Sequence, residues 1–101
     1  MSTGNKRIHI FHPDGRVEVI DSAEKPTLEQ LQGWVGGYIE HVECLHDKRV
    51  RSMYINEEGK LNGLPYNHKA TQLFWDAHPQ LVKAGWSDPI VGPAVVLEGF
   101  R

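Results

Sequence analysis

The stretch NEEGKLNGLPYNHKAT, residues 56–71, joins a predicted strand to a predicted helix and so decides the order of the fold. Gly59 and Gly63 allow the positive φ values of two successive turns, and Pro65 fixes the backbone on the approach to the helix. Asn67 stands immediately before a helical pattern, where its side chain can accept a hydrogen bond from an amide of the first turn. The stretch therefore predicts a double turn that ends a strand and caps a helix.

Upstream of this stretch, the chain predicts a hairpin and a helix. The β-branched and aromatic runs IHIFH and VEVI, residues 8–12 and 17–20, flank a turn in which Gly15 tolerates a positive φ. In KPTLEQLQGWVGG, residues 25–37, Thr27 begins a capping box and the two final glycines stop the helix.

A second strand pair is predicted for GYIEHVECL and VRSMYINEE, residues 37–45 and 50–58. Side-chain alternation puts Glu40 on one face with Val42 and Cys44, but both faces mix apolar and ionisable residues. If that face points inward, the carboxylate of Glu40 needs a donor or takes a raised pKa. The alternative, which we favour, is that Glu40 lies in water or pairs with a basic residue.

Downstream, an apolar stripe at helical spacing predicts a helix over residues 68–77. Pro79 removes a helical hydrogen bond, so we expect a break before it and a short second turn over residues 79–84. The run PIVGPAVVLEGF, residues 89–100, predicts a final strand with a bulge or edge position at its start.

The resulting order ββαββαβ predicts an α+β fold. We expect a single small domain, residues 1–101, with one mixed or antiparallel sheet and both helices packed on one face. Residues 1–5 are small and polar, and we expect them to be disordered.

The composition excludes several classes of protein. Eleven basic residues against 13 acidic ones give a net charge of −2, so no general field attracts nucleic acid or an anionic membrane. The chain contains no apolar run long enough to span a bilayer, and its N-terminus lacks a signal-peptide core. Cys44 is the only cysteine, which excludes an internal disulfide. These features predict a cytoplasmic protein without a membrane partner.

The sequence contains no catalytic or metal-binding signature. The six histidines lack the spacing of HExxH or of a zinc finger, so we expect no metal site and read them as surface residues. Cys44 is not flanked by the glycines of a turn that presents a catalytic nucleophile, so we interpret it as a small core residue. No phosphate loop is present in the sequence, and no cofactor is expected.

Nucleic-acid binding has slightly more support in the sequence than catalysis or metal binding. Lys48, Arg49 and Arg51 cluster around one turn, with Tyr54 nearby as a stacking platform. Acidic residues such as Asp47 are interleaved with them, however, which favours a solvated turn surface over a nucleic-acid interface.

Three motifs in order give the chain a family resemblance. GGYIE at 36–40, the stretch 56–71 and DPIVGPAVV at 88–96 resemble the small bacterial and bacteriophage family called domain of unknown function 3846, over residues 8–97. The family carries no assigned activity, and its occurrence on phages and mobile elements implies an accessory or host-modulating role. The segment TQLFWDAHPQLVKAGWS, residues 71–87, is longer here, which puts in doubt any function on it as a family property.

We therefore expect a non-catalytic binding module that recognises a host protein or a small anionic ligand. The polar residues at the predicted helix start carry this expectation, because free first-turn amides beside basic side chains suit a phosphate or a carboxylate. The candidate binding residues are Tyr66, Asn67, His68, Lys69 and Thr71, together with Tyr38 and Glu40.

Two alternatives stay open. A small hydrolase or nucleotide-modifying enzyme would use Glu40 as general base with His68 as its partner, which requires the two side chains to come within hydrogen-bond reach. A homo-oligomer would assemble through an exposed edge strand.

Overall fold

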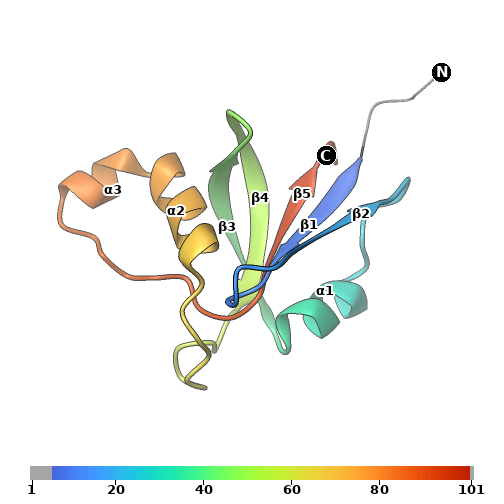
Figure 1. Ribbon diagram of the computed structural model, residues 1–101, viewed down its shortest axis with the longest axis horizontal. Helices are drawn as coiled ribbons and strands as arrows, with labels where there is room; N and C mark the ends of the chain where they lie inside the picture. Colours follow the sequence, from blue (N-terminus) through green and yellow to red (C-terminus); the bar gives the residue numbers. More distant parts are fainter. Residues whose placement is uncertain (1–5, 101) are drawn as a thin grey trace.

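The computed structural model describes residues 6–100, which form one five-stranded sheet and three helices (Figure 1). The sheet is entirely antiparallel and has the strand order β2-β1-β5-β4-β3. The predicted α+β class is confirmed, and the predicted disorder of residues 1–5 concerns positions outside the described residues. The elements are β1 (Arg7–Phe11), β2 (Val17–Asp21), α1 (Leu28–Val35), β3 (Ile39–His46), β4 (Arg49–Asn56), α2 (His68–Ala77), α3 (Pro79–Lys83) and β5 (Ala94–Glu98).

The two main helices pack on opposite faces of the sheet, so the prediction that both lie on one face is wrong. In β5, Val95 belongs to the apolar cluster under α1, whereas its neighbour Val96 belongs to the cluster under α2. Successive side chains of a strand point to opposite faces, so the sheet is covered on both sides. Figure 1 shows α2 on the left of the sheet and α1 on its right. The first four residues of β5 are all buried, as expected for a strand covered on both faces.

Local signals correctly predicted the ends of both main helices. Thr27 forms the expected capping box with Gln30, and Gly36 closes α1 with a φ of 84°. The side chain of Asn67 accepts from the amide of Ala70 and begins α2. The short turn expected over residues 79–84 is the helix α3.

The stretch 56–71 forms the predicted pair of turns, with one correction. Gly63 has a positive φ of 66°, as expected, whereas Gly59 does not. The reason for a glycine at 59 is space, because a Cβ there would lie 2.9 Å from Cγ2 of Val91. This close approach packs the turn against the segment that leads into β5.

The β3–β4 hairpin is only partly joined to the rest of the sheet. Eight residue pairs join β3 to β4, whereas β4 pairs with β5 only through Met53 and Tyr54. The outer part of the hairpin therefore diverges from β5, and Figure 1 shows β3 and β4 standing steeply beside the oblique β1 and β5. Asp47 and Lys48 close the hairpin with positive φ values, as a two-residue turn of this twist requires.

Candidate functional site

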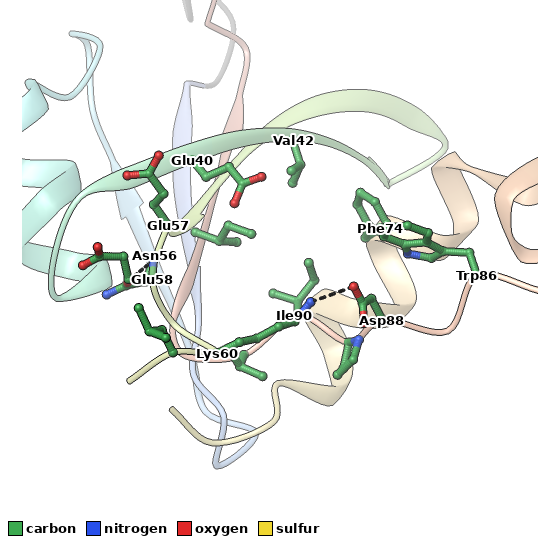
Figure 2. A pocket seen from close by; sticks show the side chains of 14 residues that line it. Glu40, Val42, Asn56, Glu57, Glu58, Lys60, Phe74, Trp86, Asp88 and Ile90 are labelled. Atoms are coloured by element: carbon green, nitrogen blue, oxygen red, sulfur yellow. Dashed lines mark hydrogen bonds and ion pairs between the residues drawn. The ribbon is translucent and has the colours of Figure 1, made fainter. Parts of the chain in front are cut away.

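A pocket of about 460 Å³ lies between the β3–β4 hairpin, α2 and the segment that follows α3 (Figure 2). Its walls are apolar and are formed by Val42, Ile55, Phe74, Ile90 and Val91. Phe74 and Val42 pack against the core cluster on the α2 side of the sheet, so the core itself forms the floor. A pocket of this size is within the range of small-ligand sites.

The polar groups around the pocket are mainly acidic. Glu40, Glu57, Glu58 and Asp88 line it, and Lys60 is its only basic lining residue among the described residues. The ammonium of Lys60 lies 3.1 Å from a carboxylate oxygen of Asp88, so this cation is already paired. In Figure 2 the carboxylate of Glu40 points into the space between the walls. The pocket therefore has apolar walls and a surplus of negatively charged lining residues.

Two large apolar side chains at the pocket are exposed. Leu61 is 84% exposed and Trp86 is 43% exposed. Apolar surface of this kind beside a concave site is typical of a binding surface rather than of a solvated turn.

The side chain of Asn56 holds the end of β4 at this pocket through hydrogen bonds to backbone groups. Its side-chain amide donates to the carbonyl oxygen of Val35 at 3.1 Å and its Oδ1 accepts from the amide of Glu58 at 2.8 Å. Gly37 leaves room for this side chain, because a Cβ there would lie 2.9 Å from Nδ2 of Asn56. The strand end and the following turn are thereby held against α1.

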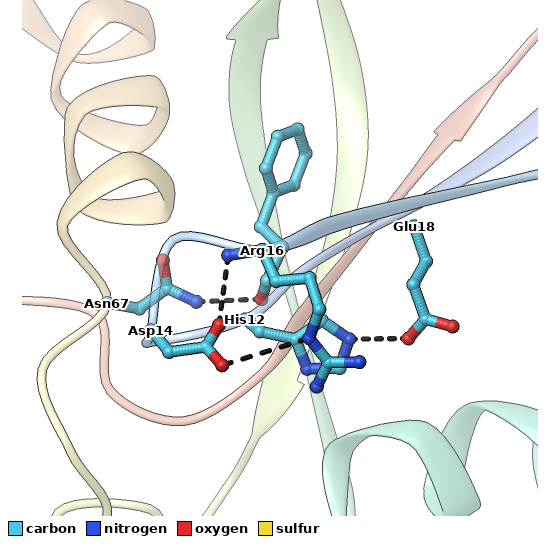
Figure 3. A network of polar contacts seen from close by, with 6 residues as sticks. His12, Asp14, Arg16, Glu18 and Asn67 are labelled. Carbon is cyan, nitrogen blue, oxygen red and sulfur yellow. Dashed lines mark hydrogen bonds and ion pairs between the residues drawn. The ribbon is translucent and has the colours of Figure 1, made fainter.

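Two of the predicted site residues are enclosed by the protein and hold the fold. Asn67 is fully buried, and its Nδ2 donates to the carbonyl oxygen of Phe11 (Figure 3). The same nitrogen donates to the carbonyl oxygen of Gly92. The hydroxyl of Thr71 donates to the carbonyl oxygen of Asn67 and accepts from the amide of Ile90. Their polar atoms are occupied by these bonds, and neither side chain faces solvent.

Three other predicted residues lie together on the surface at the start of α2. Tyr66 is 45% exposed, His68 and Lys69 are exposed, and the rings of Tyr66 and His68 meet edge to face. None of the three lines the pocket. Tyr66 pairs through its backbone with Val91, which does line it, so this surface adjoins the pocket across one backbone bridge.

The remaining two predicted residues lie at different places. Glu40 is exposed and lines the pocket, whereas Tyr38 lines a shallower neighbouring hollow of about 280 Å³. Among residues 6–100, no hydrogen bond or ion pair joins Glu40 to His68.

Sequence reasoning missed several lining residues of the pocket. Phe74 and Trp86 come from the segment of residues 71–87, whose role was in doubt, and Asp88 begins the motif that follows it. The one available signal was Trp86 itself, because a tryptophan that follows the stop of a short helix has no place in an amphipathic stripe. The ion pair between Lys60 and Asp88 joins distant parts of the chain, and no sequence pattern predicts it.

No helix within residues 6–100 combines the length and the apolarity that crossing a lipid bilayer requires.

The comparisons with known proteins give one match. A family model described as domain of unknown function (DUF3846) matches residues 6–100. Neither the search of curated proteins nor that of solved structures found a significant match. The family match spans nearly the whole chain, in agreement with the resemblance of the three sequence motifs. The chain therefore belongs to the DUF3846 family.

Proposed function

We propose that this protein is a non-catalytic binding module whose pocket takes a segment of a partner protein, with an apolar side chain next to a basic one. The observation that carries the proposal is the pocket of about 460 Å³, whose walls are apolar and whose lining carboxylates outnumber its basic groups.

The shape and the polarity of the pocket support an apolar anchor. The exposed Trp86 and Leu61 beside it would be covered by a docked segment, and burial of large apolar side chains supplies most of the affinity at such interfaces. The rim would remain in contact with water.

The negative charge at the rim distinguishes between the two kinds of ligand that the sequence suggested, a host protein and a small anionic ligand. Glu40, Glu57 and Glu58 would repel an anion and attract a Lys or Arg of the partner. A protein partner therefore fits the pocket better than a small anionic ligand. Such an anion would instead use the exposed basic side chains of His68 and Lys69.

The expected setting is that of an accessory protein of a phage or mobile element. The family resemblance implies this role, and the natural partner would then be a host protein in the cytoplasm.

A peptide-binding experiment tests the proposal. Displayed peptide libraries selected on the purified protein should enrich an aromatic or aliphatic residue flanked by Lys or Arg, and the affinity of a synthetic peptide should fall as salt is raised. Trp86→Ala and Glu40→Lys should each weaken binding by at least about tenfold, as hot-spot changes do. Leu81→Ala is a matched control, because Leu81 is exposed but does not line the pocket.

Two outcomes would contradict the proposal. The first is enrichment of acidic peptides, with binding that is lost when His68 and Lys69 are both changed to Ala. The second is binding that Trp86→Ala and Glu40→Lys leave unchanged.

The enzyme alternative has no observation in its favour. It would require Glu40 and His68 to act on one substrate, but Glu40 lines the pocket while His68 lies beside Tyr66 outside it. Assembly through the outer edge of β3 or β2 would be seen in light scattering as a mass above that of one chain.

A further inference from the structure

Three donor groups from three strands meet on the face of the sheet that α2 covers. His9 of β1, His46 of β3 and Glu98 of β5 each offer one ligand atom, and these atoms all lie within 4.8 Å of one another. Nε2 of His9 lies 2.6 Å from Oε1 of Glu98. The side chains of His9 and Glu98 are only 11% and 17% exposed, so this pair is largely shielded from water, and His46 is half-buried.

The divergence of the β3–β4 hairpin brings these residues together. In the strand order, β1 and β3 are separated by β5 and β4, yet the ring centroids of His9 and His46 are 4.7 Å apart. The ring of His46 also meets Phe11 edge to face at 5.8 Å. The end of the hairpin therefore curves over β1. Within the hairpin, Nε of Arg51 donates to the carbonyl oxygen of His46.

One of the ring nitrogens in this cluster lacks a partner. Nδ1 of His46 is buried without a hydrogen bond, and within residues 6–100 the only other such side-chain atom is Nε1 of Trp75. Buried polar atoms are nearly always satisfied by protein, water or an ion. Nδ1 of His46 therefore has an open bonding position, of the kind that water or an ion fills.

Two members of the cluster have shifted pKa values. Burial, together with the nearby charges of His9 and Arg51, lowers the pKa of His46. The hydrogen bond from His9 lowers the pKa of Glu98 and keeps this carboxylate ionised.

Other charged groups act on the cluster in opposite directions. Arg51 and Arg7 are close enough to lower the pKa of Glu98, and they would weaken the binding of a cation. The negative charge of Asp47, by contrast, raises the pKa of His46. Arg7 is paired with Asp21 at 3.4 Å, so Arg51 is the main opposing charge.

We propose that His9, His46 and Glu98 bind a divalent transition-metal ion, with zinc as the ion that this donor set suits best. Two imidazoles and one carboxylate are a common zinc ligand set, which leaves a fourth position for water or another ligand. Ligand atoms of a tetrahedral zinc ion lie about 3.3 Å apart, so the contact between His9 and Glu98 would widen slightly as the metal replaces the proton between them. The sequence suggested no metal site because positions 9, 46 and 98 have no recognisable spacing.

Zinc titration of chelator-treated protein, followed by calorimetry and native mass spectrometry, tests the site. The wild type should take up one zinc ion per chain and unfold at a higher temperature with zinc present. His46→Gln and Glu98→Gln should each weaken zinc binding by at least about tenfold, since even changes to groups that only orient a ligand have effects of this size.

His12→Gln is the matched control. His12 also contacts a carboxylate, that of Glu18, but no second histidine joins this pair among the described residues (Figure 3). The control should bind zinc like the wild type. Equal weakening in His12→Gln and His46→Gln, or no binding of zinc by the wild type at stoichiometric concentration, would overturn the proposal.

Cobalt(II) gives a second measurement that does not depend on stability. The intense visible absorption of four-coordinate cobalt should appear with the wild type and be lost in His46→Gln. Circular dichroism would check that the variant remains folded. A spectrum of hydrated octahedral cobalt with the folded wild type would contradict the site.

Discussion

The side-chain amide of Asn67 donates a hydrogen bond of 2.9 Å to the carbonyl oxygen of Phe11, a residue 56 positions earlier in the chain. The same nitrogen donates to the carbonyl oxygen of Gly92 at 2.8 Å, while Oδ1 accepts from the amide of Ala70. One fully buried side chain thus joins the end of β1, the approach to β5 and the start of α2 (Figure 3).

Asn67→Ala should destabilise the protein by about 3 kcal/mol or more, because it removes a helix cap and two buried hydrogen bonds to the carbonyl oxygens of Phe11 and Gly92. Urea unfolding followed by circular dichroism measures the change. Asn62→Ala changes an exposed asparagine of the same turn and should have little effect. Similar losses in the two variants would show that the buried bonds of Asn67 contribute little.

The hydroxyl of Thr71 predicts a second, smaller effect. Thr71→Val keeps the shape of the side chain but leaves the buried amide of Ile90 without its acceptor, which lies at 2.8 Å. We expect a loss of about 1–3 kcal/mol, the cost of an unsatisfied buried group. Thr71→Ser keeps the hydroxyl and should lose less stability than Thr71→Val in the same urea experiment. The reverse order would mean that packing of the methyl group matters more than the hydrogen bond.

Two glycines should respond to alanine in opposite directions. Gly92 has a φ of 76°, and a Cβ there would lie 2.6 Å from Cδ1 of Leu64, so Gly92→Ala should cost at least about 1 kcal/mol. Gly33 is an exposed position inside α1 with open space around it, so Gly33→Ala should stabilise by about 0.5–1 kcal/mol. Thermal unfolding of the two variants beside the wild type checks both signs. A gain in stability for Gly92→Ala would contradict the backbone argument.

The features that the sequence predicted correctly are those encoded by neighbouring residues. The capping box of Thr27 and Gln30, the cap at Asn67 and the stop at Gly36 each depend on a few adjacent positions. Such geometry is fixed locally, so strand and helix order follow from it.

The features that it missed depend on which face of a strand is buried. The alternating pattern of β3 has apolar and ionisable residues on both faces, and both faces prove to be partly covered, with Cys44 under α2 and Ile39 on the α1 side. The opposite placement of the helices therefore left no clear signature in β3. The apolar run of β5, residues 94–97, was the better indicator, since burial on both faces removes alternation.

The candidate sites were the least predictable part. The pocket combines Glu40 with Lys60 and Trp86, and the proposed metal site combines His9, His46 and Glu98. These groups meet only through the tertiary fold and the divergence of the β3–β4 hairpin. By contrast, burial of Asn67 and Thr71 shows that polar residues at a helix start can be wholly structural.

Cys44 should be unreactive in the folded protein. Its side chain is fully buried, and burial raises the pKa of the thiol from 9.0 to about 11, against the smaller opposing effect of Arg51. Iodoacetamide at neutral pH should therefore label the native protein far more slowly than the urea-unfolded chain. A Cys44→Ala, Ser87→Cys variant, which places a thiol at an exposed position, is the control and should be labelled quickly.

The same pKa shift predicts how stability changes at high pH. Because the folded state holds the thiol proton more tightly, the contribution of Cys44 is fully present below about pH 9 and is lost as pH rises towards 11. The loss should reach about 2 kcal/mol. Urea unfolding between pH 8 and about 11 should thus show a steeper decline for the wild type than for Cys44→Ala. Parallel curves would mean that the thiol does not resist ionisation in the fold.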